Sequence, residues 1–178
     1  YGRTLRFVYN GVNQLSSFTD PAGNLYSYTY NTNYALQSVT YPDQKSRQYV
    51  YEDARFSYAL TGIIDENTQR YATWTYDAKG RAVSSQHANG ADAVSLVYNV
   101  NNTTTVTDAA GAQRTYGFIK QFEVMKNTSI AGFVCDRCGP SARNYDANGF
   151  VSSRTDFNGN KTHYIFNSRG LEASRTEA

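Results

Sequence analysis

An aromatic residue returns about every 21 positions along this chain, and this repeat constrains the fold more than any other feature. The residues that carry it, which we call anchors, are separated by steps of 21, 21, 25, 22, 20, 27 and 21; they are Tyr9, Tyr30, Tyr51, Tyr76, Tyr98, Phe118, Tyr145 and Phe166. A period of this size indicates a repeat protein, in which each unit buries its apolar face by stacking on its neighbours. We therefore expect function to come from the assembled surface rather than from one set of catalytic residues.

Each repeat contains a segment with the pattern of a β-strand that ends at the anchor. In Leu25–Tyr30, three tyrosines alternate with Ser27 and Thr29. This alternation places the rings on one face of a strand and the hydroxyls on the other. A bulky side chain stands two positions before most anchors; Arg143, before Tyr145, is an exception. Tyr, Thr and Val are also the residue types that favour strands.

Turn residues follow each strand at regular positions. Glycine stands four residues after several anchors, at Gly80, Gly149 and Gly170. A second turn, about ten residues after the anchor, pairs an aspartate with a glycine three residues later: Asp20 with Gly23, Asp108 with Gly111, and Asp156 with Gly159. Glycine adopts positive φ without steric cost, and aspartate accepts hydrogen bonds from nearby backbone groups. Each repeat therefore predicts a β-hairpin, and the chain an all-β fold of about fourteen strands in a curved, twisted antiparallel sheet.

The spacing predicts a single array over residues 1–178, with an atypical unit at 119–144. The Tyr51 unit is about four residues longer than the others and the Phe118 unit about six. The latter contains Cys135 and Cys138, a CxxC pair. Such a pair is typical of half a zinc site or of a redox pair, and the structural interpretation is a loop whose thiols are free or joined locally. We expect no cofactor and no metal.

No arrangement of residues in the sequence predicts catalysis. Asp20, Asp108 and Asp156 recur at one turn position, which a structural need explains better than acid–base chemistry. His87 falls at the same turn position, and His163 lies in a strand, so no Ser/His/Asp set can be argued. The net charge of +2 without a basic run argues against nucleic-acid binding. No run of eighteen apolar residues predicts a membrane span. The chain starts at Tyr1 in mid-repeat, so we expect an excised fragment whose open strand edges associate edge to edge.

The segment Tyr145–Asn167, YDANGFVSSRTDFNGNKTHYIFN, combines Tyr-Asp-x-x-Gly, Thr-Asp-x-x-Gly and a strand ending in an aromatic pair. This pattern, with about eight anchors in register, resembles the Rhs/YD-repeat family. Gly23–Tyr28 is similar to the start of that family's self-cleavage motif, but the closing Asp-Pro-x-Gly does not follow it, so we interpret it as an ordinary repeat.

The resemblance implies a function for the array. Members of the family form large β-sheet shells in bacterial Rhs polymorphic toxins and in Tc toxin complexes. The expected role is therefore a wall segment of an exported or cell-surface bacterial shell. Its expected partners are the rest of that shell and an enclosed C-terminal toxin domain. The alternative is a carbohydrate- or cell-surface-binding module whose exposed aromatic rows stack on sugars.

Overall fold

The computed structural model describes residues 2–132 and 140–177. The chain divides into two compact units, unit 1 over residues 1–93 and unit 2 over residues 94–178. Where the structure describes the chain, its regular elements are β-strands and one short 3-10 helix, η1 (Ala88–Gly90). No helix within the described residues is long and apolar enough to cross a membrane.

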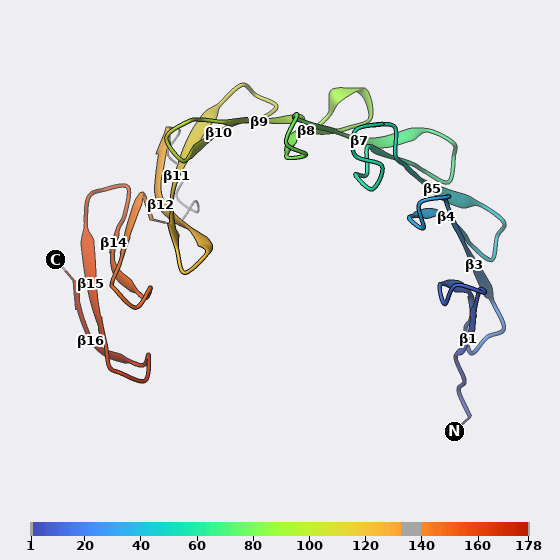
Figure 1. Cartoon of the computed structure of the whole chain (residues 1–178), viewed down its shortest axis with the longest axis horizontal. Coiled ribbons are helices and arrows are strands. Elements are labelled where there is room, and N and C mark those ends of the chain that lie inside the picture. Colours follow the sequence, from blue (N-terminus) through green and yellow to red (C-terminus); the bar gives the residue numbers. More distant parts are fainter. Residues whose placement is uncertain (1, 133–139, 178) are drawn as a thin grey trace. The chain divides into compact units, whose positions relative to one another are not determined.

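Unit 1 is an antiparallel meander in which each strand pairs with the next along the chain (Figure 1). Its strands are β1 (Arg6–Tyr9), β2 (Leu15–Thr19), β3 (Leu25–Tyr30), β4 (Leu36–Thr40), β5 (Ser46–Val50), β6 (Gly62–Ile64), β7 (Arg70–Tyr76) and β8 (Ala82–His87). The odd-numbered strands β1, β3 and β7 end at anchors, and β5 ends one residue before Tyr51. Local turn chemistry between paired strands is enough to produce this order.

Unit 2 repeats the same meander. Its strands are β9 (Val94–Tyr98), β10 (Thr103–Thr107), β11 (Gln113–Gln121), β12 (Val124–Gly132), β13 (Ala142–Tyr145), β14 (Val151–Thr155), β15 (Lys161–Phe166) and β16 (Glu172–Glu177). The all-β, antiparallel expectation is thus confirmed, with sixteen strands among the described residues instead of about fourteen. Extra residues in the Phe118 unit lengthen the β11–β12 hairpin, whose strands have nine residues each.

A β-bulge recurs beside the anchors. The register shifts at Val8/Tyr9, Thr29/Tyr30, Thr75/Tyr76, Gly117/Phe118, Asn144/Tyr145 and Ile165/Phe166, where the partner strand has one extra residue. Tyr98 pairs with Thr104 without such a shift. Because a bulge bends its strand and increases the local right-handed twist, its recurrence accounts for a strongly twisted sheet in each unit.

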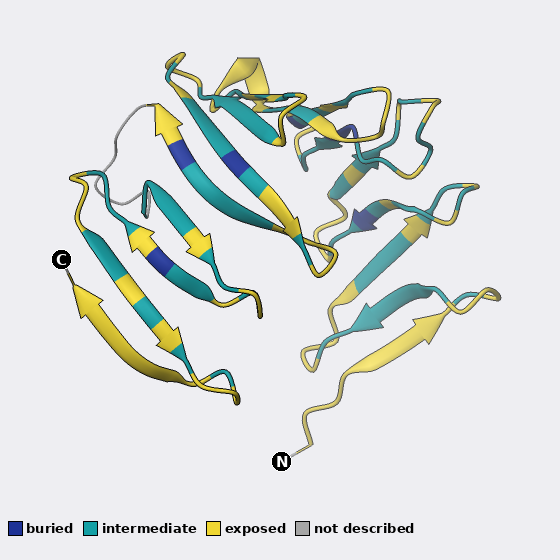
Figure 2. Cartoon of the chain, turned by 60° about the vertical axis from the view of Figure 1, so that its left-hand side comes forward, coloured by how far each residue is buried: buried dark blue, intermediate teal, exposed yellow. Residues whose placement is uncertain are grey.

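Burial is shallow, because each unit is a single layer. Elements that pack closely within a unit are neighbours in the sheet, apart from η1, which packs beside β7. Among the described residues, the buried apolar side chains are those of Val39, Ala72 and Ile130, and most others in the strands are half-buried (Figure 2). Apolar contact therefore comes from rings leaning on neighbouring strands rather than from a core between two layers.

Candidate functional site

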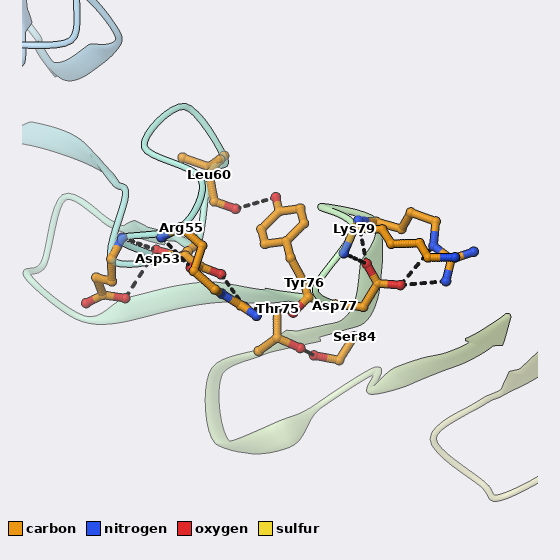
Figure 3. A network of polar contacts seen from close by, with 11 residues as sticks. Asp53, Arg55, Leu60, Thr75, Tyr76, Asp77, Lys79 and Ser84 are labelled. Carbon is orange, nitrogen blue, oxygen red and sulfur yellow. Dashed lines mark hydrogen bonds and ion pairs between the residues drawn. The ribbon is translucent and has the colours of Figure 1, made fainter.

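The anchor tyrosines join each repeat to the one before it through their hydroxyl groups. The hydroxyl donates to a backbone carbonyl 15 to 18 residues earlier in the chain. The bonds are Tyr30 to Leu15 (2.9 Å), Tyr51 to Leu36 (3.0 Å), Tyr76 to Leu60 (2.7 Å) and Tyr145 to Asn127 (2.8 Å). We call this series the hydroxyl ladder. Figure 3 shows the Tyr76 ring directed at the Leu60 carbonyl.

The ladder suits tyrosine for a physical reason. The ring lies half-buried on the sheet, while its tip reaches a backbone carbonyl group in the preceding strand or shortly before that strand begins. Burial, followed by the nearby Tyr49, raises the pKa of Tyr51, so this phenol stays protonated and able to donate. Phe118 and Phe166 fill the ring position without a hydroxyl. Tyr9 is 60% exposed, and its hydroxyl makes no ladder bond within the described residues.

The residue after the anchor closes the first turn. At Asn10, Asn31, Asp77, Asp146 and Asn167, the side-chain Oδ1 accepts from the backbone N–H groups two and four residues later, at 2.8–3.1 Å. The third residue after it has positive φ and is Gly80, Gly149 or Gly170 in three of these turns. In each turn, two backbone N–H groups that take no part in the hydrogen bonds between strands thus find an acceptor.

The second turn has the same geometry at the opposite end of the hairpins. Oδ1 of Asp20, Asp108 and Asp156 accepts from the N–H groups two and four residues later, and Gly23, Gly111 and Gly159 have φ of +86°, +80° and +90°. The side-chain amides of Asn24 and Asn160 lower the pKa of Asp20 and Asp156 by donating to the carboxylates.

The two histidines lie in repeat positions. His87 begins a turn through its backbone N–H, which donates to the Ala91 carbonyl at 2.8 Å, and its ring lies 5.0 Å from that of Tyr71. His163 lies in β15 opposite Thr176. Cys135 and Cys138 fall outside the described residues. Within the described residues, no group of three His, Cys, Asp or Glu side chains could hold a metal ion.

The two faces of the sheet carry different chemistry. On one face of unit 1, a row of rings runs from β1 through β2 and β3 to the residue after β4: Phe7, Phe18, Tyr26 and Tyr41. The Phe18 and Tyr26 rings stack at 4.4 Å. The other face carries cross-strand hydroxyl pairs: Thr29 with Ser38 (2.7 Å), Thr40 with Ser46 (2.8 Å) and Thr75 with Ser84 (2.5 Å). Figure 3 shows Thr75 and Ser84 pointing toward each other, away from the Tyr76 ring. We call these the aromatic face and the hydroxyl face.

The longer loop after Tyr51 forms a polar cavity that sequence reasoning missed. Arg70 binds both carboxylate oxygens of Glu52, at 3.2 and 2.9 Å, and also donates to the Thr61 carbonyl. A Cβ on Gly62 would overlap the Arg70 guanidinium, so glycine leaves the space that Arg70 fills. The cavity has a volume of about 460 Å³. The clustered charges of Glu52–Arg55, in a repeat of unusual length, are the signal that could have found it.

The charges of this cavity are already paired. Hydrogen bonds from Arg70, and then the Arg70 charge, lower the pKa of Glu52. Arg55 does the same for the pKa of Asp53, which it binds at 2.7–2.9 Å. Arg55 also donates to the Tyr76 carbonyl and so fastens the loop to β7 (Figure 3). Each of these two carboxylates is bound by a guanidinium group, so the charged side chains join the longer loop to the sheet and are not available as an acid–base pair.

Comparison with known proteins adds to this geometry. Residues 9–46 match a family model described as RHS Repeat. The fold is similar to the crystal structure of TcdB2-TccC3-TEV, at 14% identity and a TM-score of 0.61, covering 99% of this chain and 10% of that one. It is also similar to the crystal structure of TcdB2-TccC3 without hypervariable C-terminal region, at 12% identity and a TM-score of 0.54, covering 99% and 9%. No curated protein sequence matches the chain.

These likenesses confirm the expected fold. The chain spans about a tenth of the length of the solved chains that it matches, across nearly its own full length. The family match contains the first two anchors, Tyr9 and Tyr30. Beyond it, the same turn geometry and the hydroxyl ladder continue in both units. Residues 9–46 are therefore identified as an RHS repeat, and the fold of the chain is similar to that of the TcdB2-TccC3 structures.

Proposed function

We propose that this chain is a wall segment of an Rhs-type β-shell, within a longer protein whose C-terminal toxin or effector domain the shell encloses. Its role is structural: the repeats form the wall, and the partners are the neighbouring repeats and the enclosed polypeptide. The longer protein is then an exported or cell-surface bacterial protein. The anchors and turn residues act in this wall by joining successive hairpins.

The observation that carries the proposal is the single-layer sheet held by the hydroxyl ladder. Each unit has two open faces and no second layer within the described residues, which suits a wall that separates two spaces. The hydroxyl bonds that recur in both units run between repeats, as expected of groups that hold a wall together. A globular enzyme domain would instead bury a core between layers.

The similarity to solved structures supports the same role. The fold matches a segment of much larger chains, one of which is described as lacking a hypervariable C-terminal region. We infer that such a region carries the variable cargo, while the repeats form the shell. We extend this division to the longer protein that carries the present array.

The proposal is tested by limited proteolysis of the full-length protein. We expect the C-terminal domain to resist a protease that cleaves the same domain rapidly when it is expressed alone. The matched control is the full-length protein in mild acid or urea sufficient to open the repeats, where cleavage should become rapid. Equal cleavage rates of the enclosed and the isolated domain would contradict the proposal.

The aromatic face gives the carbohydrate alternative little support. Sugars stack on the open faces of rings. The Phe18 and Tyr26 rings, with an interplanar angle of 5°, instead turn their faces toward each other. The rings of this row therefore stabilise the pairing of neighbouring strands, as cross-strand aromatic pairs do.

A further inference from the structure

Arginines of this chain differ in their partners, because several bind a carboxylate, Arg175 of unit 2 among them, and two neighbouring ones do not. Four arginines of unit 1 each bind a carboxylate, in the pairs Arg47–Glu66, Arg55–Asp53, Arg70–Glu52 and Arg81–Asp77, at 2.7–3.0 Å. In unit 2, Arg143 and Arg154 bind no carboxylate of the described residues. They lie on neighbouring strands, in β13 and β14. This contrast shows that the fold readily supplies counter-charges to its arginines, and that among the described residues it supplies none to Arg143 and Arg154.

The two guanidinium groups share one place on the sheet. Arg143 stands directly opposite Arg154 in the antiparallel register. Opposite residues have Cβ atoms about 5 Å apart, and like charges at such positions repel each other. Both side chains are on the face that carries the Tyr145 ring, because Arg143 and Tyr145 are two positions apart in β13. The pair therefore destabilises the sheet unless an anion lies over it.

Each cation is held in place by neutral groups. The Asn127 Oδ1 accepts from Arg143 Nη1 at 2.6 Å, and the Asn127 amide is itself fixed by donating to the Gly117 and Ser129 carbonyls. The Arg154 guanidinium lies 5.5 Å from the centroid of the Tyr164 ring. A third cation, Lys126, lies 4.9 Å from the centroid of the Tyr145 ring. Ring contacts stabilise a cation without neutralising it.

Most donors of this cluster remain available. A guanidinium has five N–H donors. Arg143 uses one of its donors within the described residues, and Arg154 uses none. Four carboxylates in the described part of unit 2 are already engaged: Asp146 and Asp156 close turns, Glu123 pairs with Lys120, and Glu177 pairs with Arg175.

We propose that Lys126, Arg143 and Arg154 form a binding surface for an acidic segment of polypeptide. The forked guanidinium matches the two oxygens of a carboxylate, and Arg143, held by Asn127, and Arg154, held beside the Tyr164 ring, are pre-organised to receive it. An extended segment that presents Asp or Glu at every second residue places carboxylates about 7 Å apart on one side, so successive carboxylates can meet different cations of the cluster. The small net charge of +2 disfavours a nucleic acid, which needs a wider positive field. This surface goes beyond the wall function and does not depend on it.

The test uses the 178-residue chain and a fluorescein-labelled 12-residue peptide of alternating Glu and Ser, measured by fluorescence anisotropy at 20 mM salt. We expect binding that weakens as salt rises, because Arg154 is exposed, Lys126 and Arg143 are only half-buried, and salt screens charges that water can reach. The R143Q/R154Q variant should bind about five- to tenfold more weakly. The matched control, K45Q/K161Q, removes the same charge elsewhere: Lys161 pairs with Thr155 and so lies on the face opposite Arg154. It should bind within about twofold of the parent, a change within the range of an exposed charge.

Urea unfolding of the same variants distinguishes loss of the binding surface from misfolding. The R143Q/R154Q variant should be at least as stable to urea as the parent, because it removes a like-charge pair. Equal weakening of binding by both double variants would overturn the proposal, since any positive charge would then suffice. Absence of binding at 1 mM peptide, or tighter binding to a labelled oligothymidylate than to the peptide, would overturn it as well.

Discussion

Replacing Tyr76 by phenylalanine removes one bond of the hydroxyl ladder and leaves the ring in place. The lost bond joins the Tyr76 hydroxyl to the Leu60 carbonyl at 2.7 Å. A hydrogen bond of this kind contributes about 1 kcal/mol, and the half-buried carbonyl can recover part of it from water. We therefore expect the free energy of unfolding to fall by about 1 kcal/mol. For Tyr76→Ala we expect about 2–3 kcal/mol, because a half-buried ring loses less than a fully buried one.

Trp74 reports directly on this change. It is the only tryptophan in the chain and lies two residues before Tyr76 in β7. With a urea dependence of about 1–3 kcal/mol per molar, the loss shifts the fluorescence midpoint by roughly 0.3–1 M. The control is Tyr9→Phe, because the Tyr9 hydroxyl makes no hydrogen bond within the described residues. Equal shifts for both variants, or none for Tyr76→Phe, would refute the ladder as a source of stability.

Three further predictions concern the turns and the strand edges. Gly23→Ala should lower the free energy of unfolding in urea by about 1 kcal/mol, because φ is +86° at this position. The control, Gly11→Ala, lies at ordinary φ in equally open space and should leave this free energy unchanged. No change for Gly23→Ala would contradict the turn assignment. The pKa values of Asp20, Asp77 and Asp156 are lowered in the folded chain, so their contribution to stability is present above about pH 4 and is lost as the pH falls through the folded-state values. The D20N/D77N/D156N variant should keep its turns, because Asn10 closes the same kind of turn. Its urea midpoint should therefore fall less steeply in acid than that of the parent chain. The isolated chain should self-associate through the exposed strands β1 and β16, and Val8→Pro should reduce the light-scattering mass at high concentration; a monomeric parent chain would count against this.

The sequence predicts the hairpins well because their signals are local. An aromatic anchor, an Asn or Asp after it, and a glycine three residues later define a turn without reference to the rest of the fold. The strand alternation of Leu25–Tyr30 similarly separates rings from hydroxyls within one segment. Both patterns can be recognised in one sequence because each depends on residues fewer than ten positions apart.

Features that depend on pairing register could not be predicted in this way. The acceptor of the Tyr30 hydroxyl, the Leu15 carbonyl, is known only once β2 and β3 are aligned. The same holds for Arg70, which meets Glu52 across the sheet, and for Arg143 and Arg154, which are eleven residues apart in sequence and opposite in space. The register was hidden because the bulges shift it by one residue beside most anchors.

The β11–β12 hairpin was hidden for a different reason. Its turn is made by Phe122 and Glu123, which have φ of +52° and +60°. Such values favour glycine or asparagine, so two residues of this kind give no turn signal in the sequence. The hairpin is stabilised instead by contacts with the next turn, where Gln121 donates to the Asp146 carbonyl at 2.8 Å and Lys126 donates to the Gly149 carbonyl.

The central claim is that this array is part of a wall around another polypeptide. The most direct measurement is a cryo-electron microscopy map of the full-length protein that carries it. We predict that residues 1–178 form a continuous part of a closed β-shell, with density for the C-terminal domain inside it. An open array with the C-terminal domain outside, in contact with solvent, would contradict the account.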